Sequence, residues 1–193
     1  IQIYREFAKA GYNVQHWLLD ASKMGVPQRR ERVFFIALRK DLAEPFMEQV
    51  DMFTVLPKLR LEFDEPQIKF GEFYEAGVDD RPASKGKMFE YWQNRQKGDT
   101  LFSDSIFRTE GVKRCFTNMY IYADGISPTY TSNSDVIYLF DEYRKPNKTE
   151  SCCIGSYPQD YNFTGVQYNY LIGMSVPPVM TAQIAKQVYE QWL

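Results

Sequence analysis

The stretch that decides the fold lies near the beginning of the chain and reads Gly25-Val26-Pro27-Gln28-Arg29-Arg30-Glu31-Arg32-Val33-Phe34-Phe35-Ile36. A Gly-x-Pro turn ends the preceding element, and the apolar run 33–38 predicts a strand that is buried on both faces. Arg30 and Arg32 are two residues apart, so they point to the same side if the extended geometry begins that early. Cations held there by a rigid scaffold suit a phosphate or a polarisable carbonyl oxygen, although a basic strand entry taken alone is usually a surface feature.

A terminal helix is predicted after the prolines of the stretch Tyr170-Leu171-Ile172-Gly173-Met174-Ser175-Val176-Pro177-Pro178-Val179. Apolar residues then recur every fourth position, at Met180, Ile184, Val188 and Trp192, and Ala185 and Tyr189 widen the stripe. Such a helix needs a larger body to pack against. At the other end of the chain, the first residues predict a short helix that ends at Gly11.

These two stretches resemble the eighth and tenth motifs of the DNA cytosine-5 methyltransferases. The eighth motif reads Pro-Gln-x-Arg-x-Arg, and the tenth reads Gly-Asn-x-Val-Pro-Pro, with Met174 at the usual asparagine. A third stretch is similar to the ninth motif: Arg144-Lys145-Pro146, then Glu150, then Ser156-Tyr157-Pro158-Gln159-Asp160-Tyr161. The three motifs stand in the family order and span nearly the whole chain.

Other family motifs have no counterpart in the 193 residues. The methyl-donor loop Phe-x-Gly-x-Gly, the Pro-Cys nucleophile and the Glu-Asn-Val segment are absent from the sequence, and no cysteine follows a proline. We therefore expect the C-terminal part of a longer enzyme, whose N-terminal catalytic part lies in the same chain or in a partner chain.

The resemblance implies an α/β fold: the C-terminal part of a Rossmann-like S-adenosylmethionine-dependent methyltransferase domain plus a smaller, mostly β target-recognition domain. Residues 1–40 are expected to supply the last strands of the catalytic domain, 41–165 the target-recognition domain, and 166–193 a terminal helix that returns to the catalytic domain. Within the middle region, residues 88–93 predict one helix, and Asp124-Gly125 predicts a turn between strands.

Composition and charge bound the possible partners. The formal net charge is −2, so double-stranded DNA, the partner that the resemblance implies, would have to meet a local basic stripe. No apolar stretch approaches a membrane span, no signal peptide is visible, and a cytoplasmic location is expected. The cysteines suit neither a disulfide framework nor a metal site, and Cys152 and Cys153 are expected to be buried and inert. His16, the single histidine, is expected to be structural.

The segment 125–134 looks like the recognition loop that ends in a Thr-Leu pair in many family members, here Thr129-Tyr130. Small hydroxyl and amide side chains in it, Ser127 and Asn133 among them, can reach base edges or phosphates. The alternative is an ordinary turn between two strands. Upstream, Lys113 and Arg114, with Arg108, are candidate phosphate or guanine contacts or simple surface charges.

The chemistry that the resemblance implies is methyl transfer from S-adenosylmethionine to carbon 5 of a cytosine flipped out of the duplex, in restriction-modification. A thiolate adds to carbon 6, and an arginine that donates to O2 stabilises the charge where it develops. By its place in the motif Arg32 takes that role, Arg30 braces the site or a backbone phosphate, and Gln28 holds the loop.

For the cofactor, the tenth motif contributes Ser175 and Val176 beside the methionine part. Met174 departs from the pattern, because a thioether cannot replace the donor and acceptor of an amide. Two other functions stay open at this point: a DNA-binding module without catalysis, and one subunit of a split methyltransferase.

Overall fold

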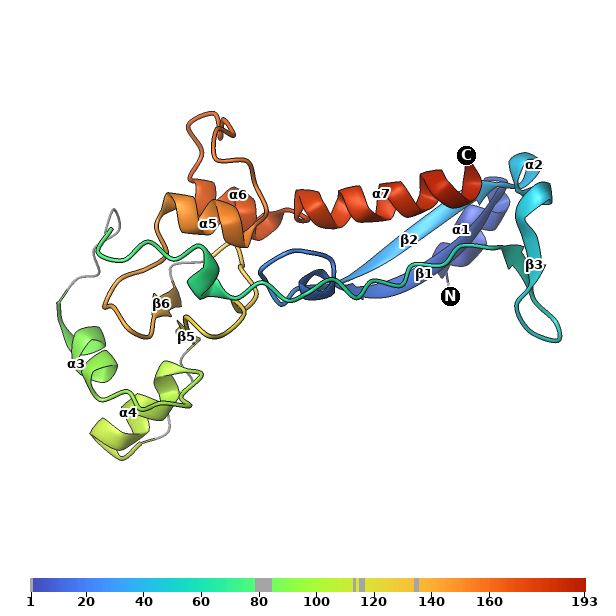
Figure 1. Cartoon of the computed structure of the whole chain (residues 1–193). Coiled ribbons are helices and arrows are strands. Elements are labelled where there is room, and N and C mark those ends of the chain that lie inside the picture. Colours follow the sequence, from blue (N-terminus) through green and yellow to red (C-terminus); the bar gives the residue numbers. More distant parts are fainter. Residues whose placement is uncertain (1, 79–84, 113, 115–116, 134–135) are drawn as a thin grey trace.

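The computed structural model describes residues 2–78, 85–112, 114, 117–133 and 136–193. The chain forms an elongated body (Figure 1). A long β-hairpin with the C-terminal helix beside it occupies one end, and a group of short helices and strands occupies the other.

The hairpin is built from β1 (Tyr12–Asp20) and β2 (Glu31–Arg39), which pair antiparallel along their whole length. The helix α1 (Gln2–Lys9) precedes it, and Gly11, with φ of 86°, makes the turn between them. The short 3-10 helix η1 (Ala21–Lys23) begins the connection to β2.

Burial alternates along β2, so the prediction of a strand buried on both faces is wrong. Phe34 and Ile36 pack against the core, whereas Val33 and Phe35 are exposed. One face of this antiparallel hairpin packs against the core, whereas the other is covered only in part, where Tyr4 of α1 contacts Phe35, and this difference gives the period of two. The same alternation extends back through Arg32 to Arg30, and these two residues share the inner face.

The helix α7 (Pro178–Trp192) covers the inner face of the hairpin (Figure 1). Met180, Ile184 and Trp192 are buried in a core with Leu19 and Met24, which confirms the predicted apolar stripe. Ala185 and Tyr189, which were expected to widen that stripe, are exposed.

A segment of the expected recognition domain belongs to the same core. Leu59 and Leu61 are buried with the hairpin and α7. Trp192 donates from its indole nitrogen to the carbonyl of Lys58 (2.6 Å), and the side chain of Gln191 bonds both backbone groups of Arg60. The packing therefore does not divide at residue 40, because residues 58–61 run back along the hairpin before the chain leaves it.

Short elements cap the far end of the hairpin: α2 (Lys40–Ala43), the 3-10 helix η2 (Glu44–Phe46), and the antiparallel strands β3 (Met47–Gln49) and β4 (Val55–Pro57). The other end of the body contains η3 (Phe70–Glu72), α3 (Lys87–Gln93), α4 (Phe102–Glu110), β5 (Met119–Ile121), β6 (Ile137–Leu139), α5 (Lys148–Ile154) and α6 (Tyr168–Met174). We call this second end the small unit.

The small unit is not mostly β among the residues that the structure describes, which corrects the sequence-based prediction. Its strands β5 and β6 have three residues each and pair parallel. The turn at Asp124-Gly125 is present, but it does not join a hairpin. Aromatic rings supply much of the packing instead, for example Phe102 stacked on Tyr120 with ring centroids 4.5 Å apart. Within the described ranges, no helix is long and apolar enough to cross a membrane.

Candidate functional site

Three segments that are far apart in the sequence meet where the hairpin joins the small unit. They are residues 28–30 before β2, residues 127–131 of the small unit, and residues 173–175 at the end of α6. We call this meeting place the junction. It brings together the segments that were assigned to the eighth motif, the recognition loop and the tenth motif.

Gln28 is buried at the junction, and its side chain bonds three different parts of the chain. Its amide nitrogen donates to the carbonyl of Ile154 (3.0 Å), and its side-chain oxygen accepts from the backbone N–H of Tyr130 (2.9 Å) and from Arg30 (3.3 Å). Gln28 also forms an isolated parallel bridge with Ser127. The side chain thus fixes the small unit against the beginning of β2.

Arg30 is 2% exposed and donates to three backbone carbonyls: Tyr130, Gly173 (2.9 Å) and Ser175 (2.7 Å). Burial, and then the positive charge of Arg32, lower the pKa of Arg30 to about 10, so it keeps its charge at neutral pH. The carbonyl dipoles that surround the guanidinium replace the water it has lost. Arg30 therefore joins the loop at Tyr130 to the end of α6.

Gly173 lets the backbone at the end of α6 lie directly against the backbone of Thr131. A Cβ atom on this residue would lie 1.9 Å from the carbonyl oxygen of Thr131, which is a fixed backbone atom. Only glycine lets the two backbones come this near. The glycine of the tenth motif thus has a steric reason in this fold.

Arg32 is half-buried at the beginning of β2, opposite Leu19 in the register. Its guanidinium donates to the carbonyl of Glu31 (2.7 Å), which is its own neighbour. Unlike Arg30, Arg32 is not held by another segment through any bond that the structure describes. Its remaining donors are available to a ligand.

The recognition loop is only partly open to solvent. Ser127 and Tyr130 are both 0% exposed, and the hydroxyl of Tyr130 bonds that of Ser151 (2.8 Å). These two side chains belong to the interior, so the expectation that they contact DNA is corrected. Thr129 is half-buried and donates its hydroxyl to the carbonyl of Arg29 (2.6 Å), and Asn133 is exposed.

The upstream basic residues have different surroundings. Arg108 is paired with Asp99, with Nη1 3.1 Å from Oδ1, and it also bonds the carbonyl of Asn94. It braces the small unit and is not a free cation. Arg114 is exposed and lies 2.8 Å from Glu110. Lys113 lies outside the described residues.

The expected cofactor residues line the end of α6. Met174 is 61% exposed and Val176 is also exposed, so both present apolar surface at the junction. The hydroxyl of Ser175 donates to the carbonyl of Ile172 (2.9 Å), and its own carbonyl accepts from Arg30. The side chains of Met174 and Val176 could form an apolar wall for an adenosyl or methionine group. The hydroxyl of Ser175 donates its proton to Ile172, and its oxygen can still accept a hydrogen bond.

A buried ionic network in the ninth-motif segment was only partly foreseen. Arg144 donates two bonds of 2.8 Å to Glu150, and it also bonds Glu142 and the carbonyl of Glu75. Burial opposes the charge of Arg144, but the hydrogen bonds that it donates to Glu150 and Glu142 outweigh this effect and raise its pKa. The sequence placed Arg144 and Glu150 in a motif, whereas Glu75 and Glu142 gave no signal.

The two described cysteines are not reactive groups. Cys152 is buried in the core of the small unit, and Cys153 is half-buried and receives a bond from Gln159 (3.3 Å). Burial raises the pKa of both thiols, so they stay protonated at neutral pH. Over the part of the chain that the structure describes, no cluster of His, Cys, Asp and Glu could hold a metal ion.

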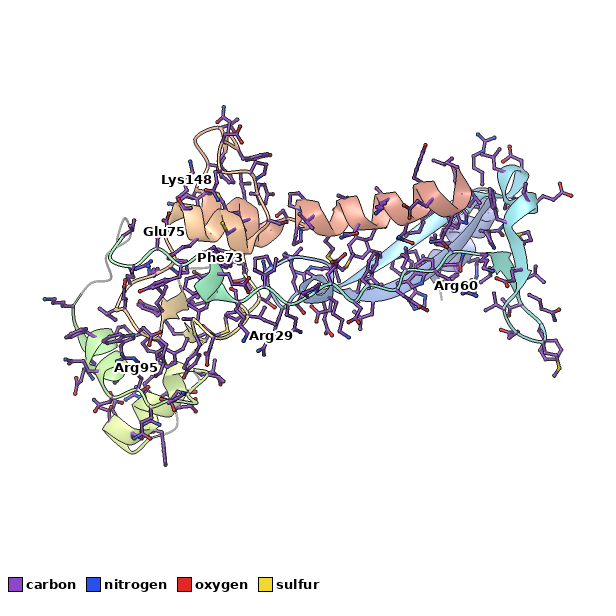
Figure 2. The ribbon with its side chains drawn as sticks, in the orientation of Figure 1. Arg29, Arg60, Phe73, Glu75, Arg95 and Lys148 are labelled. Atoms are coloured by element: carbon purple, nitrogen blue, oxygen red, sulfur yellow. The ribbon has the colours of Figure 1, made fainter. Side chains whose placement is uncertain are left out.

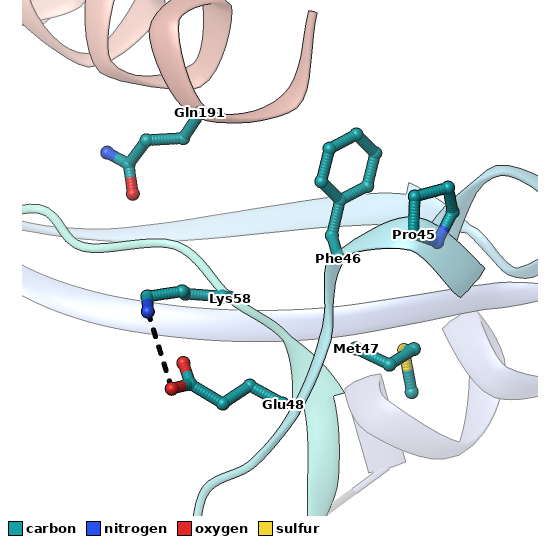
Figure 3. Close-up of a pocket in the computed structure, with 6 residues that line it drawn as sticks. All are labelled: Pro45, Phe46, Met47, Glu48, Lys58 and Gln191. Carbon is teal, nitrogen blue, oxygen red and sulfur yellow. Dashed lines mark hydrogen bonds and ion pairs between the residues drawn. The ribbon is translucent and has the colours of Figure 1, made fainter.

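A separate hollow of about 420 Å³ lies far from the junction, beside the C-terminal end of α7 (Figure 3). An ion pair between Lys58 and Glu48 (3.3 Å) spans it, and Phe46, Met47 and Gln191 line it. Lys58 and Glu48 are paired with each other, so we assign no catalytic or binding role to this hollow.

The family model of the C-5 cytosine-specific DNA methylases matches residues 1–190. The chain belongs to this family. Among curated relatives, a putative type II methyltransferase of Methanocaldococcus jannaschii, M.MJ0563P, is 26% identical over 98% of the chain and 56% of its own length. The type II methyltransferase M.MthTI of Methanothermobacter thermautotrophicus is 24% identical over 97% of the chain and 59% of its own length. The chain thus spans just over half the length of these relatives.

Solved structures agree on the fold. A DNMT2 mutant of Spodoptera frugiperda superposes with a TM-score of 0.58, at 18% identity, over 96% of the chain and 60% of that protein. A putative DNA modification methyltransferase encoded in an Escherichia coli prophage also gives a TM-score of 0.58, at 17% identity, over 98% of the chain and 63% of that protein. The α/β fold of the chain is that of a methyltransferase.

Proposed function

We propose that the chain is the C-terminal part of a DNA cytosine-5 methyltransferase that transfers a methyl group from S-adenosylmethionine to a flipped cytosine in a specific DNA sequence. The family match over residues 1–190 carries this proposal. The names of the type II relatives favour a role in restriction-modification. We also propose that the protein acts on DNA in the cytoplasm. Residues 1–61 and 176–193 would complete the catalytic domain, and the small unit would read the target.

Arg32 is proposed as the donor to O2 of the flipped cytosine. Its half-buried position and its free donors suit a group that must meet a ligand, whereas the terminal nitrogens of the buried Arg30 already donate to three backbone carbonyls and to Gln28. A cation at O2 stabilises the negative charge that develops when a nucleophile adds to the ring. Arg30 and Gln28 are positioning residues that hold the two segments beside Arg32.

Thr129, Asn133 and Arg114 are the remaining proposed DNA contacts. The hydroxyl of Thr129 donates to the carbonyl of Arg29, so its oxygen can still accept a hydrogen bond and its methyl group can still contact a base. Asn133 and Arg114 are exposed, and the ion pair of Arg114 with Glu110 is weak enough at the surface to exchange for a phosphate. Arg114 would contact the backbone, and Thr129 would contact a base edge.

S-adenosylmethionine would supply the methyl group when bound. Met174 and Val176 would give an apolar wall beside it, and Ser175 an acceptor. The groups that the family uses as donor loop and nucleophile do not occur in these 193 residues. We therefore expect no turnover by this chain alone.

The test is a transfer assay with tritiated S-adenosylmethionine and mixed-sequence duplex DNA, run on the 193-residue chain and on the complete reading frame that contains it. Methylation of cytosine by the complete protein, and none by the chain, is the expected result. Turnover by the pure chain would refute the assignment of missing parts. DNA binding without methylation by either protein would favour the binding-module alternative, and activity restored only by a second polypeptide would favour a split enzyme.

A further inference from the structure

Arg29 stands at a position that the family motif leaves variable, yet its backbone is fixed on both sides by the recognition loop. Its N–H donates to the carbonyl of Ser127 (3.0 Å), and its carbonyl accepts from the hydroxyl of Thr129. Its neighbours Gln28 and Arg30 are buried, while the side chain of Arg29 is exposed and points away from the body (Figure 2). The junction therefore presents this one guanidinium outward from a rigid base.

A hollow of about 390 Å³ opens beside Arg29, and we call it the Arg29 pocket. Its walls include Met119, Tyr122, Ile126 and Pro128, and among the residues that the structure describes Arg29 is the one charged residue that lines it. The pocket lies between the junction and the strand β5. Its volume is within the range of small-molecule sites.

Apart from Arg29, the described walls of the Arg29 pocket are uncharged, and most of them are apolar or aromatic, with Thr100 and Thr129 as the hydroxyl residues. The hydroxyl of Tyr120 bonds that of Ser105 (2.9 Å), and the hydroxyl of Tyr122 donates to the carbonyl of Asp99 (2.7 Å), so both phenols are satisfied inside the small unit. Burial raises the pKa of Tyr120 to about 12 and also raises that of Tyr122. An occupant would thus meet mainly apolar and aromatic surface, with Arg29 as the cation at the rim.

We propose that the Arg29 pocket accepts a nucleobase that has left the DNA stack, with Arg29 bound to the adjoining phosphate. A base offers a flat face that packs on aromatic and apolar side chains regardless of its identity. The neighbouring phosphate is the group that an exposed guanidinium binds best. This inference rests on the proposed function, because it takes DNA as the substrate, and it adds a site for a second unstacked base beside the one that reacts.

Two variants separate the roles of charge and pocket. Arg29→Ala removes the cation. Gly125→Leu fills the pocket, and its backbone permits a side chain, because a Cβ on Gly125 would meet Tyr122 at ordinary contact distances of 3.5 and 3.6 Å. Arg60→Ala is the matched control, because Arg60 is also an exposed arginine and lies beside α7, far from the pocket (Figure 2).

The experiment measures binding of the chain to two fluorescein-labelled duplexes by fluorescence anisotropy: one fully paired, and one of the same sequence with a single unpaired adenine. We expect about tenfold tighter binding of the bulged duplex, a low value for stacking one base. Gly125→Leu should abolish this preference and keep the affinity for the paired duplex. Arg29→Ala should weaken binding to the bulged duplex and reduce the slope of log K against log salt by about 0.9, the loss of one phosphate contact.

Equal binding of the two duplexes by the parental chain would overturn the pocket, as would a preference that survives Gly125→Leu. The same salt slope for Arg29→Ala and Arg60→Ala would overturn the phosphate contact. These results leave the proposed methyltransferase function standing, whereas failure to bind either duplex would contradict both.

Discussion

Removal of the Arg30 side chain should cost this fold more than any other single arginine substitution at the junction. In Arg30→Met the length is kept and the donors are lost, so the carbonyls of Tyr130, Gly173 and Ser175 are left without their partner. Each buried acceptor left unsatisfied costs about 1–3 kcal/mol. The variant no longer bears the free-energy cost of burying a charged guanidinium, which offsets part of this loss. We therefore expect the free energy of unfolding to fall by about 4 kcal/mol. This is a large share of the roughly 5–15 kcal/mol by which domains are stable.

The assay is urea unfolding followed by tryptophan fluorescence, since Trp17, Trp92 and Trp192 report on both ends of the body. Arg32→Met is the matched control and should lose less than about 1 kcal/mol, because its one described bond is to the exposed backbone of Glu31. A loss below 1 kcal/mol for Arg30→Met, with an unchanged m-value, would refute the view that Arg30 holds the junction together.

Three further predictions concern the same region. Gly173→Ala should destabilise the fold by more than about 2 kcal/mol, because its Cβ would overlap the backbone of Thr131; urea unfolding checks this, and a near-parental midpoint would contradict it. Thr129→Ala in the complete enzyme should weaken binding to the cognate site by about 1–3 kcal/mol, and the variant should lose discrimination at one base pair. Competition binding on singly altered sites checks this, and discrimination at the other base pairs should change little. Cys152 and Cys153 should react with a thiol reagent far more slowly at pH 8 than after unfolding, because burial raises the pKa of both and holds them as thiols; equal rates before and after unfolding would show that they are open.

The sequence predicted β2 and α7 as elements because both are long and rich in apolar residues. The strand was expected from its apolar run and the terminal helix from its prolines and its apolar spacing, and Met180 and Ile184 are buried as that spacing requires. The error in β2 came from reading an apolar run as a doubly buried strand. Because the exposed outer residues Val33 and Phe35 are also apolar, the sequence of β2 does not show whether one or both of its faces are covered.

The small unit could not be predicted in the same way, because its order comes from long-range contacts. The helix α4 was missed, although Gly111 in a left-handed conformation marks its end and Asp104 caps its beginning. Tyr130 was expected to contact DNA because the resemblance places it in the Thr-Leu pair of the recognition loop. Its burial depends on Gln28 and Ser151, which are 102 and 21 residues away and leave no local pattern.

The role of Arg32 is the central claim, and single-turnover methylation at saturating DNA tests it most directly. In the complete enzyme, Arg32→Ala should slow methyl transfer by about 100-fold or more, as the loss of one oxyanion donor does elsewhere. Affinity for DNA should fall by only about tenfold, the value of one charged contact. Methylation at near the parental rate would contradict the account and leave Arg32 as a structural or phosphate-binding arginine.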